Sequence, residues 1–111
     1  MKAVQKFFGK NVALILIIFL MSNLSYLSSF SCSLSVLPSG ITKLSKLTNL
    51  YLDNNQLSSL PDSITNLTLM YEIGIYNNRV CNLSQSIITW INEHVHGTDF
   101  GKTWQETQNC N

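Results

Sequence analysis

Residues 34–79 read LSVLPSGITKLSKLTNLYLDNNQ (Leu34–Gln56) and then LSSLPDSITNLTLMYEIGIYNNR (Leu57–Arg79). The two 23-residue segments carry apolar residues at matching positions, and a third copy begins at Val80 and keeps the pattern as far as Trp90. The matching columns are Leu34, Leu57 and Val80; Leu37, Leu60 and Leu83; Ile41, Ile64 and Ile87; Leu44, Leu67 and Trp90; Leu47 and Met70; Leu50 and Ile73; Leu52 and Ile75; Pro38 and Pro61; and Asn55 and Asn78. Chance spacing in a leucine-rich chain does not produce matched proline and asparagine columns, so the period indicates a repeated structural unit.

The shared pattern, L-x-x-L-P-x-x-I-x-x-L-x-x-L-x-x-L-x-L-x-x-N-x, resembles the leucine-rich repeat family in its 23-residue, proline-containing form. In such a repeat, alternate residues such as Leu50 and Leu52 point inward from a short strand, and the following asparagine bonds backbone groups of adjacent coils. One coil buries little apolar surface alone, whereas stacked coils form a continuous core. The resemblance therefore implies an α/β fold: a short right-handed solenoid with a parallel sheet of two or three strands, irregular or 3-10 convex segments and a helical C-terminal cap.

The first 31 residues have the layout of a secretory signal peptide. Lys2, Lys6 and Lys10 form a basic start, Val12–Met21 (VALILIIFLM) is an uninterrupted apolar run, and a serine-rich stretch follows. A membrane-spanning helix needs roughly 20 apolar residues, so this shorter run favours a cleaved signal over an uncleaved membrane anchor. We expect cleavage before Cys32, with cleavage after Ser22 as the competing site.

Cys32 has three interpretations: a buried repeat position, a lipidated N-terminus of a bacterial lipoprotein, or a residue removed with the signal. It lies 23 residues before Asn55, in a column where the family often accepts cysteine, whereas Ser29 stands where the lipidation motif favours leucine. An uncleaved anchor or a lipidated Cys32 are the two routes by which the chain would attach to a membrane. Leu27 also lies 23 residues before Leu50, which suggests a degraded coil in front of the two full ones.

Charge and length limit the possible partners of the mature chain. Removal of residues 1–31 leaves 111 − 31 = 80 residues and 4 basic against 6 acidic side chains, a net charge of 4 − 6 = −2. The chain has no cluster of lysine and arginine and no aromatic residues interleaved with basic ones, so nucleic acid is excluded as a partner. A single domain of this size has a core near the lower limit for stability and is expected to need covalent reinforcement.

The segment after the repeats is expected to supply that reinforcement. From Ser84 onward, apolar residues recur at helical spacing (Ile87, Trp90, Ile91 and Val95), and Gly97 follows where a helix would end. This pattern predicts an amphipathic helix that covers the open end of the last coil. The cysteines that bracket the segment, Cys81 and Cys110, are expected to form a disulfide. The segment resembles the disulfide-closed caps of extracellular leucine-rich repeat proteins. The predicted domains are therefore a signal peptide at 1–31, leucine-rich repeats at 32–80 and a C-terminal cap at 81–111.

The resemblance also implies where a ligand binds, because this family most often uses the concave face formed by strand side chains that point away from the core. These positions are Asn49, Tyr51, Asp53 and Asn54 in one coil, and Glu72, Gly74, Tyr76 and Asn77 in the next. Tyrosines flanked by amides and carboxylates suit protein recognition, and aromatic rings also suit sugars. Two strands offer much less than the roughly 800 Å² per partner of a standard interface, which favours weak or multivalent contact over tight solitary binding.

Catalytic and metal-binding signals are weak. His94 and His96 with Glu93 are the only cluster with metal-binding chemistry, but residues two apart on a helix point in different directions and no third ligand follows at a motif spacing. The chain lacks the G-x-S-x-G and G-x-x-x-x-G-K-[ST] motifs. We therefore expect no enzyme activity, cofactor or metal, but a secreted or cell-surface module that binds a protein, with a glycan as a second ligand class. The alternative is a truncated or structural repeat protein with no ligand of its own.

Overall fold

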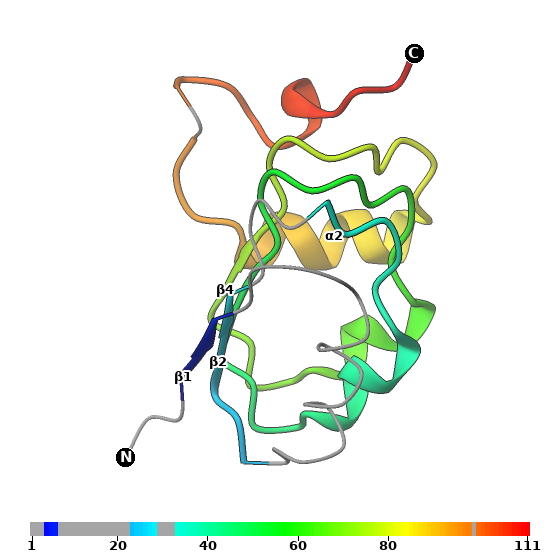
Figure 1. The fold of residues 1–111 in the computed structure, drawn as a ribbon. Helices are drawn as coiled ribbons and strands as arrows, with labels where there is room; N and C mark the ends of the chain where they lie inside the picture. The colour runs from blue at the N-terminus through cyan, green and yellow to red at the C-terminus, as the bar shows by residue number, and fades with distance from the viewer. Residues whose placement is uncertain (1–3, 7–22, 29–32, 99) are drawn as a thin grey trace.

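The computed structural model describes residues 4–6, 23–28, 33–98 and 100–111. Within these residues, four short parallel strands form one sheet in the order β1 (Val4–Lys6), β2 (Tyr26–Ser28), β3 (Asn49–Tyr51) and β4 (Glu72–Gly74), which lies at the left of Figure 1. Two 3-10 helices, η1 (Ser39–Lys43) and η2 (Asp62–Asn66), lie on the opposite side of the molecule. The predicted mixed α/β class and the parallel sheet are thus confirmed.

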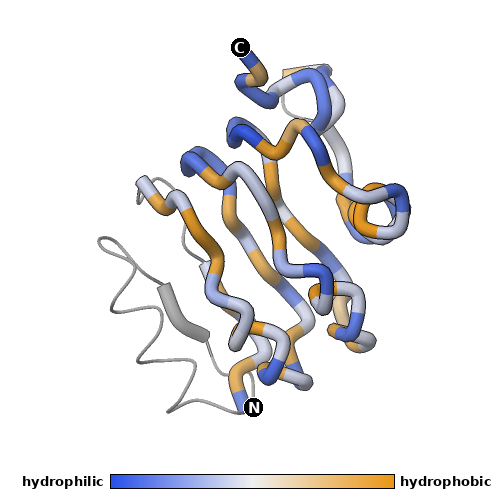
Figure 2. Tube along the Cα trace, turned by 90° about the vertical axis from the view of Figure 1, so that its right-hand side faces the viewer, coloured by the Kyte–Doolittle hydropathy of each residue, from blue (hydrophilic) through white to orange (hydrophobic). Residues whose placement is uncertain are grey.

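The strand register follows the period of the sequence. Leu27 of β2 pairs with Leu50 of β3, and Leu50 pairs with Ile73 of β4, so successive partners are 23 residues apart. Figure 2 shows the corresponding segments of the chain lying side by side, with hydrophobic stretches at equivalent places. Pro38 and Pro61 each precede a 3-10 helix, where proline's fixed φ is tolerated and its missing N–H costs nothing.

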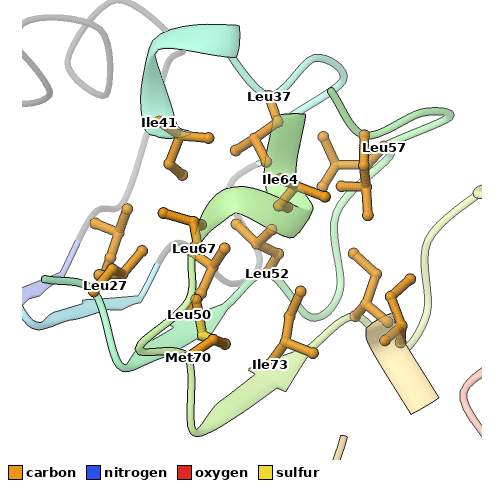
Figure 3. Packing of buried hydrophobic residues seen from close by; sticks show 14 of the residues in the cluster. Leu27, Leu37, Ile41, Leu50, Leu52, Leu57, Ile64, Leu67, Met70 and Ile73 are labelled. Carbon is orange, nitrogen blue, oxygen red and sulfur yellow. The ribbon is translucent and has the colours of Figure 1, made fainter. Parts of the chain in front are cut away.

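The core fills the space between the sheet and the two 3-10 helices (Figure 3). The predicted apolar columns supply most of its buried side chains, and Leu83 is the one column member that is only partly buried. Leu52 and Ile75, one residue beyond their strands, are also fully buried, so the inward register predicted from the alternation is correct.

Asn55 and Asn78 are buried polar side chains that replace missing backbone partners. The Oδ1 atom of Asn78 accepts a hydrogen bond from the Leu57 N–H at 3.0 Å, while its Nδ2 donates to the Leu52 carbonyl of the preceding segment at 2.9 Å. The Asn55 Oδ1 accepts from the Leu34 N–H at 2.9 Å in the same manner. An unpaired buried backbone group costs about 1–3 kcal/mol, so each amide stabilises a turn that has no ladder partner.

The sheet extends further toward the N-terminus than the two or three strands expected. β2 lies inside the predicted signal peptide, yet Leu24 and Leu27 are fully buried in the common core. The Ser25 carbonyl accepts hydrogen bonds from the Thr48 N–H at 2.8 Å and from the Thr48 hydroxyl at 2.9 Å. Residues 23–28 are therefore part of the folded unit, as the degraded coil suggested. Val12–Met21, Ser22 and Cys32, on which the apolar run, the competing cleavage site and the lipidation hypothesis depend, lie outside the described residues.

The C-terminal cap begins with helix α2 (Gln85–His94), close to the expected bounds. Helix α2 packs on η2 and β4 with Ile87, Trp90 and Ile91 buried, and Trp104 packs into the same core just before the short helix η3 (Gln105–Thr107). None of the helices formed by the described residues has the length and apolar character needed to cross a bilayer.

A disulfide joins Cys81 to Cys110, with a Cα–Cα distance of 5.7 Å, which confirms the predicted pair. The chain end is fixed beside it, because the Asn109 N–H donates to the Asn78 carbonyl at 2.8 Å and the Gln108 Nε2 donates to the Ile75 carbonyl at 3.0 Å. The cap therefore attaches directly to the turn that follows β4.

Candidate ligand-binding face

The side chains of β2, β3 and β4 that point away from the core form what we term the outer sheet face. In register across it, Tyr26 aligns with Asn49 and Glu72, and Ser28 aligns with Tyr51 and Gly74. Four of these side chains are half-buried: Tyr26, Asn49, Tyr51 and Glu72. Sheet pairing thus brings together Asn49, Tyr51, Glu72 and Gly74 from the predicted set.

Tyr51 is the centre of a hydrogen-bonded cluster on this face. Its hydroxyl donates to Glu72 Oε2 at 2.6 Å and accepts from Asn49 Nδ2 at 3.1 Å, while its ring lies 5.2 Å from the ring of Tyr26. Burial, followed by the hydrogen bond to the Glu72 carboxylate, raises the pKa of Tyr51 to about 12. The ring is therefore held neutral and in one orientation at ordinary pH.

The next two predicted residues, Asp53 and Tyr76, are fixed by the backbone and the cap. Asp53 Oδ1 accepts a hydrogen bond from the Tyr76 N–H at 2.9 Å, and the carboxylate occupies the space beside Gly74, where an added Cβ would overlap it. Tyr76 is half-buried against the core, and its hydroxyl donates to the Gly97 carbonyl at 2.9 Å. The tyrosine ring, expected to point away from the core, instead packs partly against it, and its hydroxyl is bonded to the loop after α2.

Asn54 and Asn77 lie in the turns after the strands rather than on the strand face. Both have a left-handed backbone, with φ of 60° and 57°, which asparagine tolerates better than most residues. Asn77 Nδ2 donates to Asn54 Oδ1 at 2.9 Å, so the two amides form a ladder between neighbouring turns. The Asn77 N–H donates to the Thr107 hydroxyl at 3.0 Å, which ties the ladder to the cap.

Two polar hollows border this amide ladder. The first is lined by Asp53, Asn54, Tyr76, Asn77 and Thr98, and the second by Asn55, Gln56, Asn77, Asn78, Arg79, Thr107 and Asn109. Each has a volume of about 280 Å³ and is open to solvent, and Asn77 lines both. The structure therefore brings four of the predicted residues into one hollow, separate from the Tyr51 cluster.

Sequence reasoning missed Tyr26, Thr98 and Arg79. Tyr26 lies 23 residues before Asn49, so the repeat period could have located it, but the signal-peptide pattern placed the boundary after it. Thr98 and Arg79 line the hollows only because the cap folds back over the last turn, and no local pattern signals that contact.

The histidines of the cap contact different backbone groups. His94 Nδ1 lies 2.6 Å from the Trp90 carbonyl oxygen, and His96 Nε2 lies 3.0 Å from the Tyr71 carbonyl oxygen. Among the described residues, no three His, Cys, Asp or Glu side chains are grouped so that they could hold a metal ion.

These contacts provide surfaces for binding: aromatic rings offer flat amphipathic area, and amides offer donors and acceptors together. The hydrogen bonds that hold Tyr51, Asp53 and Asn77 fix the positions of these groups before any ligand arrives. No protein-family model matches the chain, and no curated protein or solved structure matches it.

Proposed function

We propose that the protein is an exported, non-enzymatic binding module of the leucine-rich repeat type, and that its outer sheet face contacts a protein partner. The 23-residue strand register, the two 3-10 segments and the buried asparagines support the repeat assignment. The pairing of Asn49 with Glu72 and of Tyr51 with Gly74 across the strands supports the choice of the outer sheet face.

The Tyr26–Tyr51–Glu72 cluster is the observation that carries the proposal. The Tyr51 ring packs against Tyr26, and its hydroxyl is bonded to Glu72, so these side chains have already lost much of their rotamer freedom. Immobilising a rotamer-rich side chain on binding costs about 0.5–1.5 kcal/mol, and a preformed cluster avoids most of that cost. Tyrosine is also enriched among the residues that dominate interface energy.

The Cys81–Cys110 disulfide supports export, because such bonds persist in oxidising compartments and are rare in the cytosol. A secreted or cell-surface protein is consistent with the basic start and apolar run of the sequence. The short sheet favours weak or multivalent contact, since a standard interface buries about 800 Å² per partner.

Affinity capture tests this function. The full chain, Tyr51→Ala and Tyr71→Ala are immobilised and exposed to envelope and medium proteins of the source organism. Tyr71 is a matched control, because its ring is 63% exposed and lies before β4 rather than on the outer sheet face. We expect one protein to be retained by the wild type and Tyr71→Ala and lost with Tyr51→Ala.

Purified partner, titrated against the three chains, then gives the affinities. Equal retention by the wild type and both variants would remove the outer sheet face as the binding site. Failure of the wild type to retain any protein would favour the alternative, a structural repeat protein with no ligand.

A further inference from the structure

We propose that the two hollows on either side of Asn77 form one continuous trough that binds a neutral oligosaccharide. This proposal goes beyond the binding function above, because it concerns a different surface, termed here the polar trough. Its residues are Asp53, Asn54, Gln56, Tyr76, Asn77, Arg79, Thr98, Thr107 and Asn109.

Continuity follows from the shared residue. Asn77 lines both hollows, and its amide is bonded to Asn54 Oδ1 at 2.9 Å, so the amide ladder forms the floor where the hollows meet. A ligand that crosses the ladder contacts both. Each hollow has a volume of about 280 Å³, close to the lower end of the range of about 300–1,000 Å³ for small-molecule sites.

The chemistry of the lining points to a polyhydroxylated ligand. Amide side chains and the Thr98 hydroxyl supply donors and acceptors at close intervals, which matches the alternating hydroxyls of a sugar. Tyr76 adds aromatic surface at one end, and aromatic rings pack against the apolar faces of sugars. The trough thus combines dense hydrogen-bonding capacity with little apolar area.

Charge argues against an ionic ligand. Asp53 lies at one end and Arg79 at the other, so neither sign dominates. The Asp53 carboxylate already accepts the Tyr76 N–H, which fixes its position. An anionic polymer such as a nucleic acid would need several cations, and among the described trough residues Arg79 is the one cation.

The trough is preformed by contacts from both sides. Asn54 and Asn77 are fixed by their turns, Thr107 accepts the Asn77 N–H, and the Asn109 N–H is bonded to the Asn78 carbonyl. The Cys81–Cys110 disulfide holds the segment that carries Thr107 and Asn109. A site fixed before binding loses little entropy when it is occupied.

The test uses isothermal titration of the full chain with three neutral tetrasaccharides: β1,4-linked N-acetylglucosamine, β1,4-linked glucose and α1,4-linked glucose. Asn77→Gly removes the shared amide, and glycine accepts the left-handed backbone without strain. Gln56→Ala removes a second trough amide from an exposed position, where we expect little effect on folding. Gln85→Ala is the matched control at an exposed site on α2, and Tyr51→Ala reports on the outer sheet face.

We expect at least one tetrasaccharide to bind the wild type, and both trough variants to weaken it by about tenfold, as loss of roughly 1.4 kcal/mol would. Gln85→Ala and Tyr51→Ala should retain wild-type affinity. Absence of binding by all three sugars overturns the polar trough, and so does binding that Tyr51→Ala removes while Asn77→Gly and Gln56→Ala retain it. Either outcome leaves protein capture by Tyr51 unaffected, so failure here is separate from failure of the proposed function.

Discussion

At the scale of single residues, the alternation of buried and outward side chains assigns different effects to leucines of the same size. Leu52→Ala removes a fully buried side chain and should lower the free energy of unfolding by about 2–5 kcal/mol. Leu69→Ala is the control, because Leu69 is 58% exposed and its truncation leaves no cavity. Urea unfolding of both variants measures the difference. A greater loss in Leu69→Ala would mean that the inward and outward positions are reversed.

The Tyr51 hydroxyl gives a pH signature of the outer sheet face. Its folded-state pKa, raised to about 12 from an ordinary value of 10.0, favours the neutral phenol in the folded protein. The contribution of this pKa difference to the free energy of unfolding is fully present below pH 10 and is lost as the pH rises toward 12. In a spectrophotometric titration of the four tyrosines, Tyr51→Phe should remove the component that ionises last, and Glu72→Gln should shift it to lower pH. An unchanged late component in both variants would refute the Tyr51–Glu72 cluster.

At this scale, the inward position was predicted correctly for residues whose role is defined within their own 23-residue segment. Leu50, Leu52 and Asn55 are buried as their columns indicated, because one coil's pattern specifies them. Tyr76 differs from expectation because the loop that covers its ring lies 21 residues further along the chain. The period contains no information about that loop, so no repeat-based argument could have found the contact.

At the scale of elements, the cap is the part whose stability depends on a covalent bond. The disulfide joins two cysteines that are 29 residues apart in the sequence. Reducing it, or replacing both cysteines in the double variant Cys81→Ser, Cys110→Ser, opens the loop between them. Closing a loop of this length stabilises the fold by about 3.5 kcal/mol in the chain-entropy treatment, so we expect a clear fall in melting temperature under reducing conditions. Calorimetry with and without reductant measures it. Identical melting curves would show that packing of α2 and Trp104 alone holds the cap.

The elements themselves were predictable to different degrees. Helix α2 and the two 3-10 segments were expected because helical spacing and the proline positions lie within short stretches of sequence. The sequence assigned β2 to the signal peptide, because a serine-rich stretch after an apolar run has the same sequence pattern whether it is cleaved off or becomes part of the fold. Its role depends on pairing with β3, and pairing is not a local property.

At the scale of the whole molecule, the core includes residues 23–28, and this predicts where processing can occur. A chain that begins at Asn23 loses β1 but keeps Leu24, Leu27 and the Ser25 contacts with Thr48, whereas a chain that begins at Ser33 loses all of them. We expect residues 23–111 to melt at a distinctly higher temperature than residues 33–111, and the N-terminus of the exported protein, read by mass spectrometry, to fall at or near Asn23. Equal melting of the two chains would show that β2 contributes nothing to the fold.

The arrangement of the whole molecule also explains why the polar trough escaped sequence analysis. Asn54 and Asn77 were assigned to the ligand-binding set from the repeat alone, but Thr98, Thr107 and Asn109 join them only when the cap returns to the last turn. A site shared between a repeat and a cap is visible only after both have folded.

The pair formed by Asp53 and Gly74 restricts how this protein can evolve. Ser28, Tyr51 and Gly74 occupy one column of the sheet and alternate between small and large, and the Asp53 carboxylate fills the space that a side chain at position 74 would need. A side chain at position 74 requires the Asp53 carboxylate to move and disturbs its hydrogen bond with the Tyr76 N–H, so we expect substitution at Gly74 to be tolerated better when residue 53 is shortened as well. The two 23-residue segments, however similar their pattern, therefore differ at this column: the second has a glycine beside the carboxylate that the first supplies.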